Sequence, residues 1–299
     1  MSNKPRVLVF LSAYNGEKYL PEQLDSIFKQ KDVDVFVVVS DDVSSDDSLE
    51  LLRRYESEGR LCVHANKHNQ GFTYNFLDLI YLNKFKGYDY YALSDQDDYW
   101  MEDKLIHAIN KLQEEDKHFY CSNLTVVDSN LQNPSPMNKF KIKKKDYHAS
   151  YLLENICTGC TVVFDNDYIN QLYKYYPNDI YLHDYWLFLI AVFTSSYVYD
   201  PESRILYRQH ENNMIGSENE NISYYLKKFK SSKNYRHNLF SQLLLGYSNE
   251  MSKDDIKDIK SFLSYKKRPS QRFRIFFSKR FKTKDHSKLR KIKLLLGKY

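Results

Sequence analysis

Apolar residues along the chain fall into short runs that are separated by polar segments. In the first third of the chain these runs are rich in Val, Leu and Ile, which is typical of strands buried on both faces. They predict strands at residues 6–12, 33–39, 61–65 and 88–93. The segments between them carry apolar side chains at helical spacing and predict helices at residues 17–31, 47–55 and 71–83. Strands that alternate with helices in this way predict an α/β fold, with a mostly parallel sheet covered by helices on both faces.

Beyond residue 100 the alternation continues and then becomes irregular. Residues 104–113 predict a helix and residues 119–127 a strand, whereas residues 129–150, with two prolines and several lysines, predict a loop. The remaining chain predicts a strand at 158–164, a buried helix at 185–193, a short strand at 204–208 and amphipathic helices within 222–265. We therefore expect one domain over residues 1–221, divided near residue 128, and a helical, basic extension over residues 222–299.

Carboxylates follow two of the predicted strands at the point where each strand ends. Asp41 and Asp42 follow the second strand, and the segment Asp95-Gln96-Asp97-Asp98 follows the fourth. In parallel sheets ligands bind at the carboxyl ends of strands, and adjacent carboxylates that repel one another are stabilised by a shared cation such as Mg²⁺ or Mn²⁺. The pattern favours a site for a metal and a diphosphate. The alternative is a set of solvated acidic turns that cap the helices after them.

Three further segments carry residues suited to chemistry. Asp184 stands at the start of an apolar helix, where it is either a helix cap or a general base. Arg208 and His210 supply a cation and an imidazole, which suit a diphosphate or its metal but are also common structural residues. The pair Cys157 and Cys160 has C-x-x-C spacing, but it lacks the second pair of a Cys₄ zinc site and precedes a strand.

Composition restricts the class of protein. Of 299 residues, 42% are hydrophobic, 28% are charged and four are cysteine, which fits a folded globular chain and excludes a disulfide-stapled scaffold. The longest apolar run, Tyr185–Phe193, is too short to span a bilayer, and the N-terminus lacks the apolar core of a signal peptide, so we expect a cytoplasmic protein. Neither a G-x-x-x-x-G-K-[ST] nor a G-x-G-x-x-G motif occurs.

Charge is distributed unevenly. Residues 266–299 contain 14 Lys or Arg and one acidic residue, so this tail carries +13 while residues 1–265 carry −8. Cations interleaved with Phe, Ile and Leu favour an amphipathic segment on an anionic membrane surface. A solvated tail and a nucleic-acid site are the alternatives, and the acidic body argues against nucleic acid.

Read in order, the motifs resemble family 2 glycosyltransferases with a GT-A fold. More narrowly, they are similar to the bacterial branch that builds capsules and other surface polysaccharides and includes rhamnosyltransferases. The resemblance covers about residues 5–216, and Val43 stands where the family has glycine. The matching segments are Ala13-Tyr-Asn-Gly16, Ser40-Asp-Asp-Val-Ser-Ser-Asp46, Asn69-Gln-Gly71 with Asn75, Ser94-Asp-Gln-Asp-Asp-Tyr-Trp100, Thr158-Gly-Cys160, His183-Asp-Tyr-Trp186 and Tyr207-Arg-Gln-His210.

The resemblance implies roles for individual positions. Residues 1–128 would bind the nucleotide and residues 129–221 the acceptor. Asp184 would be the general base. The residues implied to contact the nucleotide are Ala13, Tyr14, Asn15, Asp41, Asp42, Asn69, Gly71, Asn75, Asp95 and Gln96. Those implied to hold a divalent metal, Mn²⁺ or Mg²⁺, are Asp97, Asp95 and His210. Those implied to lie near the diphosphate or the acceptor are Arg208, Thr158, Gly159, Trp100 and His183.

The expected activity is an inverting, metal-dependent transfer of a sugar from a nucleoside diphosphate to a hydroxyl of a growing surface polysaccharide or lipid-linked acceptor. By resemblance the first donor is dTDP-rhamnose, and UDP-galactose or another UDP-hexose is the alternative. The expected place is the inner face of the plasma membrane, with no nucleic-acid partner. Two functions of another class stay open, a nucleotidyltransferase and a non-catalytic scaffold. The glycine-rich loop that a nucleotidyltransferase carries after its first strand is absent.

Overall fold

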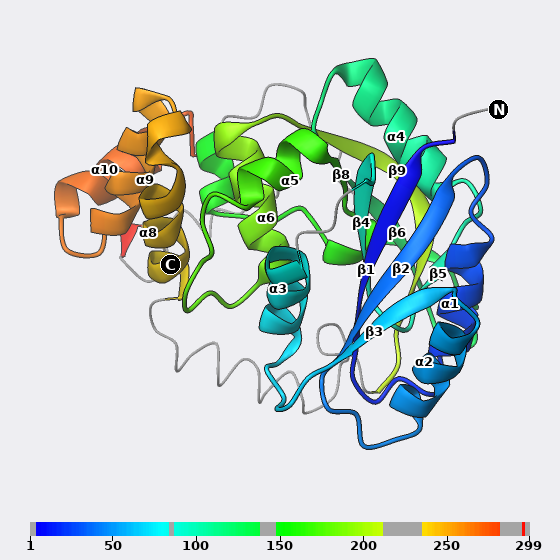
Figure 1. The fold of residues 1–299 in the computed structure, drawn as a ribbon. Coiled ribbons are helices and arrows are strands. Elements are labelled where there is room, and N and C mark those ends of the chain that lie inside the picture. The colour runs from blue at the N-terminus through cyan, green and yellow to red at the C-terminus, as the bar shows by residue number, and fades with distance from the viewer. Residues whose placement is uncertain (1–3, 84–86, 138–147, 212–234, 282–294, 297–299) are drawn as a thin grey trace.

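The computed structural model describes residues 4–83, 87–137, 148–211, 235–281 and 295–296. Its strands form one nine-stranded sheet in the order β3-β2-β1-β4-β8-β6-β9-β5, with β7 paired to β6 (Figure 1). The strands are Arg6–Ala13 (β1), Asp34–Asp41 (β2), Leu61–Ala65 (β3), Tyr90–Ser94 (β4), Tyr99–Trp100 (β5), Phe119–Val127 (β6), Ser135–Pro136 (β7), Val163–Asp165 (β8) and Tyr197–Arg208 (β9).

Helices cover both faces of this sheet. The covering helices are Leu20–Phe28 (α1), Ser48–Ser57 (α2), Phe72–Asn83 (α3), Lys104–Glu115 (α4), Asn166–Leu172 (α5) and His183–Thr194 (α6). Three further helices, Tyr235–Tyr247 (α8), Lys253–Ser264 (α9) and Pro269–Phe277 (α10), follow in the C-terminal part of the described chain. Single 3₁₀ turns lie at His148–Leu152 (η1), Gly159–Thr161 (η2) and Ser248–Glu250 (η3). The predicted α/β fold with a mostly parallel first half is confirmed, because β1 pairs in parallel with both β2 and β4, and β2 with β3.

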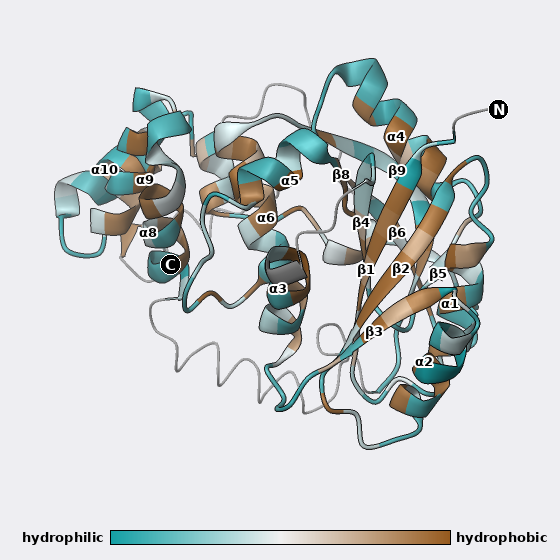
Figure 2. Cartoon of the chain, in the orientation of Figure 1, coloured by the Kyte–Doolittle hydropathy of each residue, from teal (hydrophilic) through white to brown (hydrophobic). Residues whose placement is uncertain are grey.

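Alternation along β1 divides the interior into two cores. Val7 and Leu11 point into a core beneath α1, α2 and α4, whereas Leu8 and Phe10 point into a larger core beneath α3, α5 and α6. In Figure 2 β1 and β2 are largely brown, as is much of α6, whereas α2 is largely teal. This burial on both faces is the physical reason that the strand sequences are almost continuously apolar.

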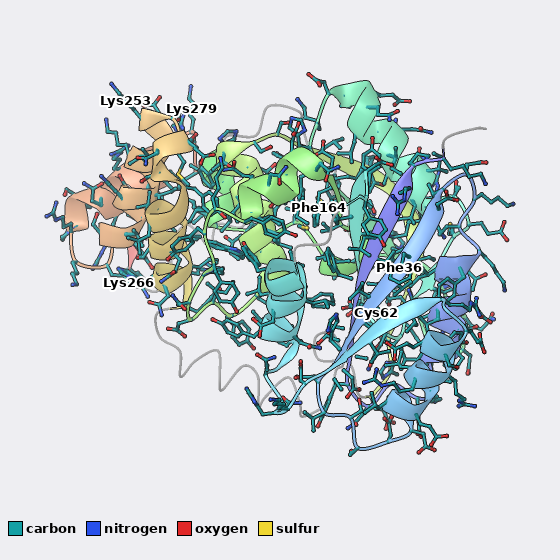
Figure 3. All side chains as sticks on the ribbon, viewed as in Figure 1. Phe36, Cys62, Phe164, Lys253, Lys266 and Lys279 are labelled. Atoms are coloured by element: carbon teal, nitrogen blue, oxygen red, sulfur yellow. The ribbon has the colours of Figure 1, made fainter. Side chains whose placement is uncertain are left out.

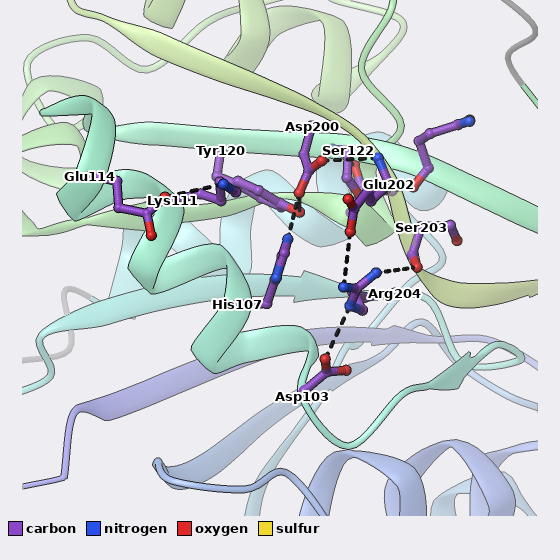
Figure 4. Close-up of polar contacts among 12 residues, drawn as sticks. Asp103, His107, Lys111, Glu114, Tyr120, Ser122, Asp200, Glu202, Ser203 and Arg204 are labelled. Atoms are coloured by element: carbon purple, nitrogen blue, oxygen red, sulfur yellow. Dashed lines mark hydrogen bonds and ion pairs between the residues drawn. The ribbon is translucent and has the colours of Figure 1, made fainter.

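A polar cluster ties α4 to β9 on the flank of the sheet (Figure 4). His107 Nε2 lies 2.6 Å from Asp200 Oδ2, and the Tyr120 hydroxyl donates to the same carboxylate oxygen at 3.1 Å. Arg204 Nε donates to Asp103 Oδ2 at 3.1 Å. The cluster holds β9 in place, and β9 ends at Arg208, one of the predicted site residues.

Several predicted boundaries are wrong because tertiary contacts shift them. Residues 158–164 were predicted as a strand, but they begin with the turn η2, in which the Thr161 hydroxyl donates to the Thr158 carbonyl at 2.8 Å. Strand β8 follows and pairs antiparallel with β4 and β6. Helix α1 begins at Leu20 rather than residue 17, because the N–H groups of Tyr19 and Leu20 both bond to the Gly16 carbonyl at 3.0 Å.

Other differences are additions to the predicted pattern. Helix α6 begins two residues early, β9 begins seven residues before residue 204, and α5 was not predicted. The predicted loop over 129–150 contains β7 and part of η1, and its residues 138–147 lie outside the described ones, as do residues 222–234 of the predicted helical segment.

Helix α8 packs against α6, α9 against α8, and α10 against α9, so these C-terminal helices lie at the opposite end of the molecule from β2 and β3 (Figure 1). Leu239, Ile259 and Ile275 belong to the same core as α6. The basic tail is therefore in part a folded helix, whereas its residues 282–294 and 297–299 lie outside the described ones. Among the helices whose residues are described, none has the length and apolar content needed to cross a bilayer.

Candidate functional site

The loops that follow β1, β2 and β4 meet at one edge of the sheet. The parallel register places Ala13 beside Asp41 and Leu11 beside Ser94, so the three strands end at the same level. The acidic segments that the sequence predicts at strand ends are thereby neighbours in space. This edge is where an open α/β sheet binds ligands.

Asp41 is linked to the first loop through Ser44. The Ser44 hydroxyl donates to Asp41 Oδ1 at 2.5 Å, and it accepts from the Asn15 N–H at 3.0 Å. In return the Ser45 N–H donates to Asn15 Oδ1 at 2.7 Å. These bonds fix the loops after β1 and β2 against each other beside Tyr14, whose side chain is 48% exposed.

Val43 has a left-handed backbone conformation, which glycine adopts most readily. Its φ is 67°, a left-handed value that a β-branched side chain disfavours by about 1–2 kcal/mol. The neighbours impose this value, because the Asp42 N–H donates to the Ala13 carbonyl at 2.8 Å and the Ser44 N–H to Asp41 Oδ2 at 3.1 Å. The turn after β2 therefore forms with Val43 in a strained backbone conformation.

Asp42 is buried and holds the loop after β3. Its two carboxylate oxygens accept the backbone N–H groups of Gln70 and Gly71, both at 2.8 Å, and its carbonyl accepts from Asn69 Nδ2 at 2.9 Å. Asn75 is buried and donates to the Ser12 hydroxyl at 2.7 Å. Four of the predicted nucleotide contacts, Asp42, Asn69, Gly71 and Asn75, thus serve in this structure to position the loops around Asp41.

Gln96 clasps the first loop with both atoms of its side-chain amide. The Tyr14 N–H donates to Gln96 Oε1 at 2.8 Å, and Gln96 Nε2 donates to the Tyr14 carbonyl at 3.0 Å. Gly16 makes room for this clasp, since a Cβ atom there would lie 2.3 Å from Gln96 Oε1. The acidic loop after β4 and the loop after β1 are therefore joined by one side chain.

Asp97 and His210 face each other across this edge. Asp97 Oδ2 lies 2.9 Å from His210 Nε2, and the His210 ring packs on Tyr19 at 4.7 Å between ring centroids. Arg208 holds the acidic loop through a hydrogen bond from its Nε to the Asp97 carbonyl at 2.8 Å. Its Nη2 also donates to the Glu22 carboxylate. The sequence analysis did not identify Tyr19 and Glu22 as site residues, because their contacts with His210 and Arg208 join segments far apart in the sequence.

Asp95 belongs to a different group from Asp97 and His210. One oxygen each of Asp95 and Asp98 and the Cys160 sulfur lie within 4.8 Å of one another. Burial raises the pKa of Asp95 to about 7, and Asp98 Oδ2 has no hydrogen-bond partner among the described residues. The predicted ligand set of Asp95, Asp97 and His210 is thus divided into two neighbouring groups in this structure.

Trp100 does not occupy the position predicted for it. Its side chain is fully buried in the core beneath α1 and α4, with Lys104 Nζ 3.6 Å from the ring centroid. Its backbone N–H donates to the Ser26 hydroxyl at 3.1 Å. An acceptor cannot reach the ring there, so the predicted acceptor contact is wrong for Trp100.

Asp184 lies in the first turn of α6 and is only partly buried. Burial raises its pKa from 3.8 to about 7, although hydrogen bonds from Tyr185, Asn155 and Gly159 favour the ionised form. Its charge also raises the pKa of Asp95, which places the two carboxylates within electrostatic reach. Asp184 therefore has the accessibility, the location and the basicity of a general base.

His183 is packed closely beside Asp184. Its ring stacks on Phe76 at 4.3 Å, and a Cβ atom on Gly159 would lie 2.8 Å from its Nε2. Burial lowers its pKa to about 3, so the ring is neutral, and neither of its nitrogens has a hydrogen-bond partner among the described residues. Thr158, the neighbour of Gly159, is partly exposed with its hydroxyl 4.0 Å from the Met137 sulfur.

Sequence comparison identifies the family of this protein. A family model described as glycosyl transferase family 2 matches residues 8–173, which is more than half of the chain. The chain belongs to glycosyltransferase family 2. This glycosyltransferase is 34% identical, over 73% of its own length and 76% of the relative, to the dTDP-rhamnosyl transferase RfbG of Shigella flexneri.

Solved structures agree on the fold of this glycosyltransferase. It matches S. aureus TarS in complex with UDP-GlcNAc at a TM-score of 0.58 and 16% identity, covering 97% of this chain and 89% of that one. It matches the mannosyltransferase PcManGT of Pyrobaculum calidifontis, in complex with GDP-Man and Mn²⁺, at a TM-score of 0.59 and 15% identity, covering 90% and 72%. The fold is GT-A-like, and the chain is a glycosyltransferase that uses a nucleotide-sugar.

Proposed function

We propose that this glycosyltransferase moves a sugar, by inverting, divalent-metal-dependent transfer, from a nucleoside-diphosphate donor to a hydroxyl of a growing cell-surface polysaccharide or lipid-linked acceptor. The observation that carries the proposal is that Asp41 and the pair Asp97–His210 lie at one sheet edge, with the weakly acidic Asp184 within electrostatic reach of Asp95. The first donor that we propose is dTDP-rhamnose, by likeness to RfbG. UDP-galactose or another UDP-hexose is the second. The family assignment removes the nucleotidyltransferase and scaffold alternatives.

The nucleotide half of the donor fits the loops around Tyr14. Asp41 and Asn15 lie in two loops held together by Ser44, and the exposed Tyr14 side chain stands beside them. Gln96 joins these loops to the acidic loop, so a base bound near Asp41 and a diphosphate bound near Asp97 would be held by one connected frame. Such a frame reduces the ordering cost of binding the donor.

The side-chain ligand atoms near the acidic loop after β4 fit a divalent cation. Asp97 and His210 offer a carboxylate and an imidazole 2.9 Å apart, and the buried Asp98 has an oxygen without a partner among the described residues. Oxygen ligands suit Mg²⁺ and Mn²⁺, and imidazole is accepted by transition metals. We assign Asp97 and His210 as the residues that would hold the ion, with Asp95 and Asp98 beside them. When bound, the ion would neutralise charge on the departing diphosphate.

Asp184 performs the proton transfer in this proposal. It accepts the proton of the acceptor hydroxyl while that oxygen attacks the anomeric carbon and the nucleoside diphosphate leaves. One displacement inverts the configuration, and no enzyme nucleophile is required. His183 and Gly159 lie beside this carboxylate, and Thr158, the residue before Gly159, is partly exposed. We place the reaction in the cytoplasm, at the inner face of the membrane that carries a lipid-linked acceptor.

Ligand-induced stabilisation tests the proposal directly. UDP, dTDP, GDP and CMP are each added with and without Mn²⁺, and unfolding is followed for the wild type, Asp97→Ala and the exposed control Asp25→Asn. A nucleotide at 100 times its Kd stabilises by about 2.7 kcal/mol. A Mn²⁺-dependent shift with dTDP or UDP that Asp97→Ala abolishes and Asp25→Asn retains supports the proposal. The absence of a shift with every nucleotide refutes it.

Donor identity and stereochemistry need a second measurement. Each nucleotide-sugar is incubated with the enzyme and a short acceptor glycan, and the product linkage is determined by NMR. A β-configured product from an α-configured donor, or the reverse, supports inversion. Retention of configuration contradicts the role of Asp184 as a base in a single displacement.

A further inference from the structure

Helix α10 presents two phenylalanines to solvent, and exposed basic residues flank it in the sequence. Phe273 is 57% and Phe277 74% exposed, and the two stand four residues apart, so they lie on one helix face. They are the only phenylalanines among the exposed large hydrophobic residues of the described chain. Residues 266–281 contain seven Lys or Arg and no acidic residue.

The cations of this segment divide into two groups. Arg274 and Arg280 turn inward and pair with Asp258, while Arg272 donates to the Tyr265 carbonyl at 3.0 Å. The second group is exposed and flanks the phenylalanines at both ends of α10. Its members are Lys266, Lys267, Arg268 and Lys279. We call these four cations with Phe273 and Phe277 the basic face.

The inward contacts fix the orientation of the basic face. Ile275 is 1% and Phe281 3% exposed, so both anchor the segment in the core on the opposite side from Phe273. Figure 3 shows Lys253 and Lys279 at the upper edge of the group of C-terminal helices and Lys266 at the lower part of the same group. The helix is thus held with Phe273 and Phe277 outward, and the four cations that flank it are exposed and form no ion pair with a described residue.

We propose that the basic face docks this enzyme on an anionic lipid surface. The phenylalanines match the headgroup boundary of a bilayer, and the flanking cations match its negative charge. Each cation close to such a surface strengthens binding about fivefold, so the four together with two inserted rings give reversible attachment. Nucleic acid fits less well, because residues 1–265 carry a net charge of −8 and would be repelled by a polyanion that extends beyond the face.

The docking face is mechanically connected to the reaction site. Phe240 of α8 packs on Tyr185, the neighbour of Asp184, at 6.3 Å between centroids, and on Phe262 of α9 at 5.1 Å. Asp258 of α9 then holds α10 through Arg274 and Arg280. Docking on a membrane would therefore orient the acceptor side of the site toward that membrane. This consequence rests on the proposed function, whereas the docking of the basic face does not depend on it.

Vesicle cosedimentation of the full chain tests the proposal. Vesicles of phosphatidylcholine alone are compared with equimolar phosphatidylcholine and phosphatidylglycerol, at low and high salt. Two variants remove the face, the triple change Lys266→Gln, Lys267→Gln and Arg268→Gln, and the double change Phe273→Ser and Phe277→Ser. Matched controls are the triple change Lys29→Gln, Lys31→Gln and Arg54→Gln on the α1–α2 side, and Leu245→Ser, an exposed apolar residue of α8 that is 71% exposed. Unfolding midpoints verify that each variant is folded.

The expected result is salt-sensitive binding that is at least tenfold stronger to the anionic vesicles, weakened at least tenfold by either variant of the face and unchanged in the controls. Equal binding to both vesicle types, no binding, or full binding by either folded face variant overturns the proposal. Fluorescence polarisation with a short duplex and a single strand is run in parallel, and tighter binding to nucleic acid than to vesicles also overturns it. Nucleotide-induced stabilisation is measured on the same samples, so a failure of docking is distinguished from a failure of the proposed function.

Discussion

Replacing Asp184 by asparagine should make the protein more stable and far less active. A pKa raised from 3.8 to about 7 means that keeping this carboxylate ionised in the folded state costs up to about 4 kcal/mol, at about 1.4 kcal/mol for each unit of pKa. Part of the side chain is accessible to solvent, so screening reduces this figure, and we expect Asp184→Asn to gain about 2–4 kcal/mol at pH 8. An asparagine cannot accept the acceptor proton, so the rate should fall about 10²–10⁴-fold.

The gain in stability should depend on pH with a defined sign. Because the folded pKa lies above the unfolded one, the wild type is most stable when Asp184 is protonated, and it loses stability as the pH rises from about 4 to about 7. The advantage of Asp184→Asn should therefore be full above about pH 7 and should shrink to less than half near pH 5.

Urea unfolding at these two pH values, with a coupled assay of nucleoside diphosphate release, measures both effects. Asp25→Asn serves as the control, because it makes the same chemical change at a carboxylate that is exposed on α1. Equal stability of Asp184→Asn and wild type at pH 8 would refute the inferred burial cost. Activity within threefold of wild type would refute the role as a base.

Three further predictions concern the same sheet edge. The kcat/KM of the wild type should fall as the pH drops below about 7, because protonation of Asp184 removes the base; a flat profile from pH 5 to 8, measured where the protein stays folded, contradicts this. Val43→Gly should raise the free energy of unfolding by roughly 0.5–1 kcal/mol in urea, since relief of the left-handed strain at φ 67° exceeds the entropy cost of glycine; a loss of stability contradicts it. Gly16→Ala should weaken nucleotide binding at least tenfold in calorimetry, because its Cβ would lie 2.3 Å from Gln96 Oε1, and adding Gln96→Ala to this variant should cost little more; full affinity of Gly16→Ala shows that the clasp is dispensable.

Much of the parallel half of the sheet follows from local pattern. Strands β1 and β2 are almost continuously apolar because both faces are covered, and α1 carries its apolar residues at helical spacing. These signals involve neighbours in sequence, which is why periodicity finds them. Residues 158–164 were predicted wrongly because their conformation is set by hydrogen bonds between Thr161, Thr158 and the distant Ser122.

The candidate site was likewise predicted in part from the sequence and decided in part by tertiary contacts. The sequence placed carboxylates at the ends of two strands, and the structure brings those ends together. The sequence could not show that Asp42 is occupied in holding a loop, or that Trp100 is enclosed in the core, because the hydrogen-bond partners lie 24 or more residues away. The type of a side chain restricts the chemistry that it can perform. Its accessibility to solvent and its hydrogen-bond partners are determined by how the folded chain packs around it.

What the sequence by itself determined, therefore, is the set of chemical groups and the alternating order of strands and helices, both of which are local properties of the chain. Only the tertiary structure decided how each group is used. Burial in the first turn of α6 raises the pKa of Asp184, and inward pairing with Asp258 removes Arg274 and Arg280 from the surface while Phe273 stays exposed. The physical reason is that ionisation and exposure depend on the dielectric and the charges contributed by segments far apart in sequence, which no local pattern contains.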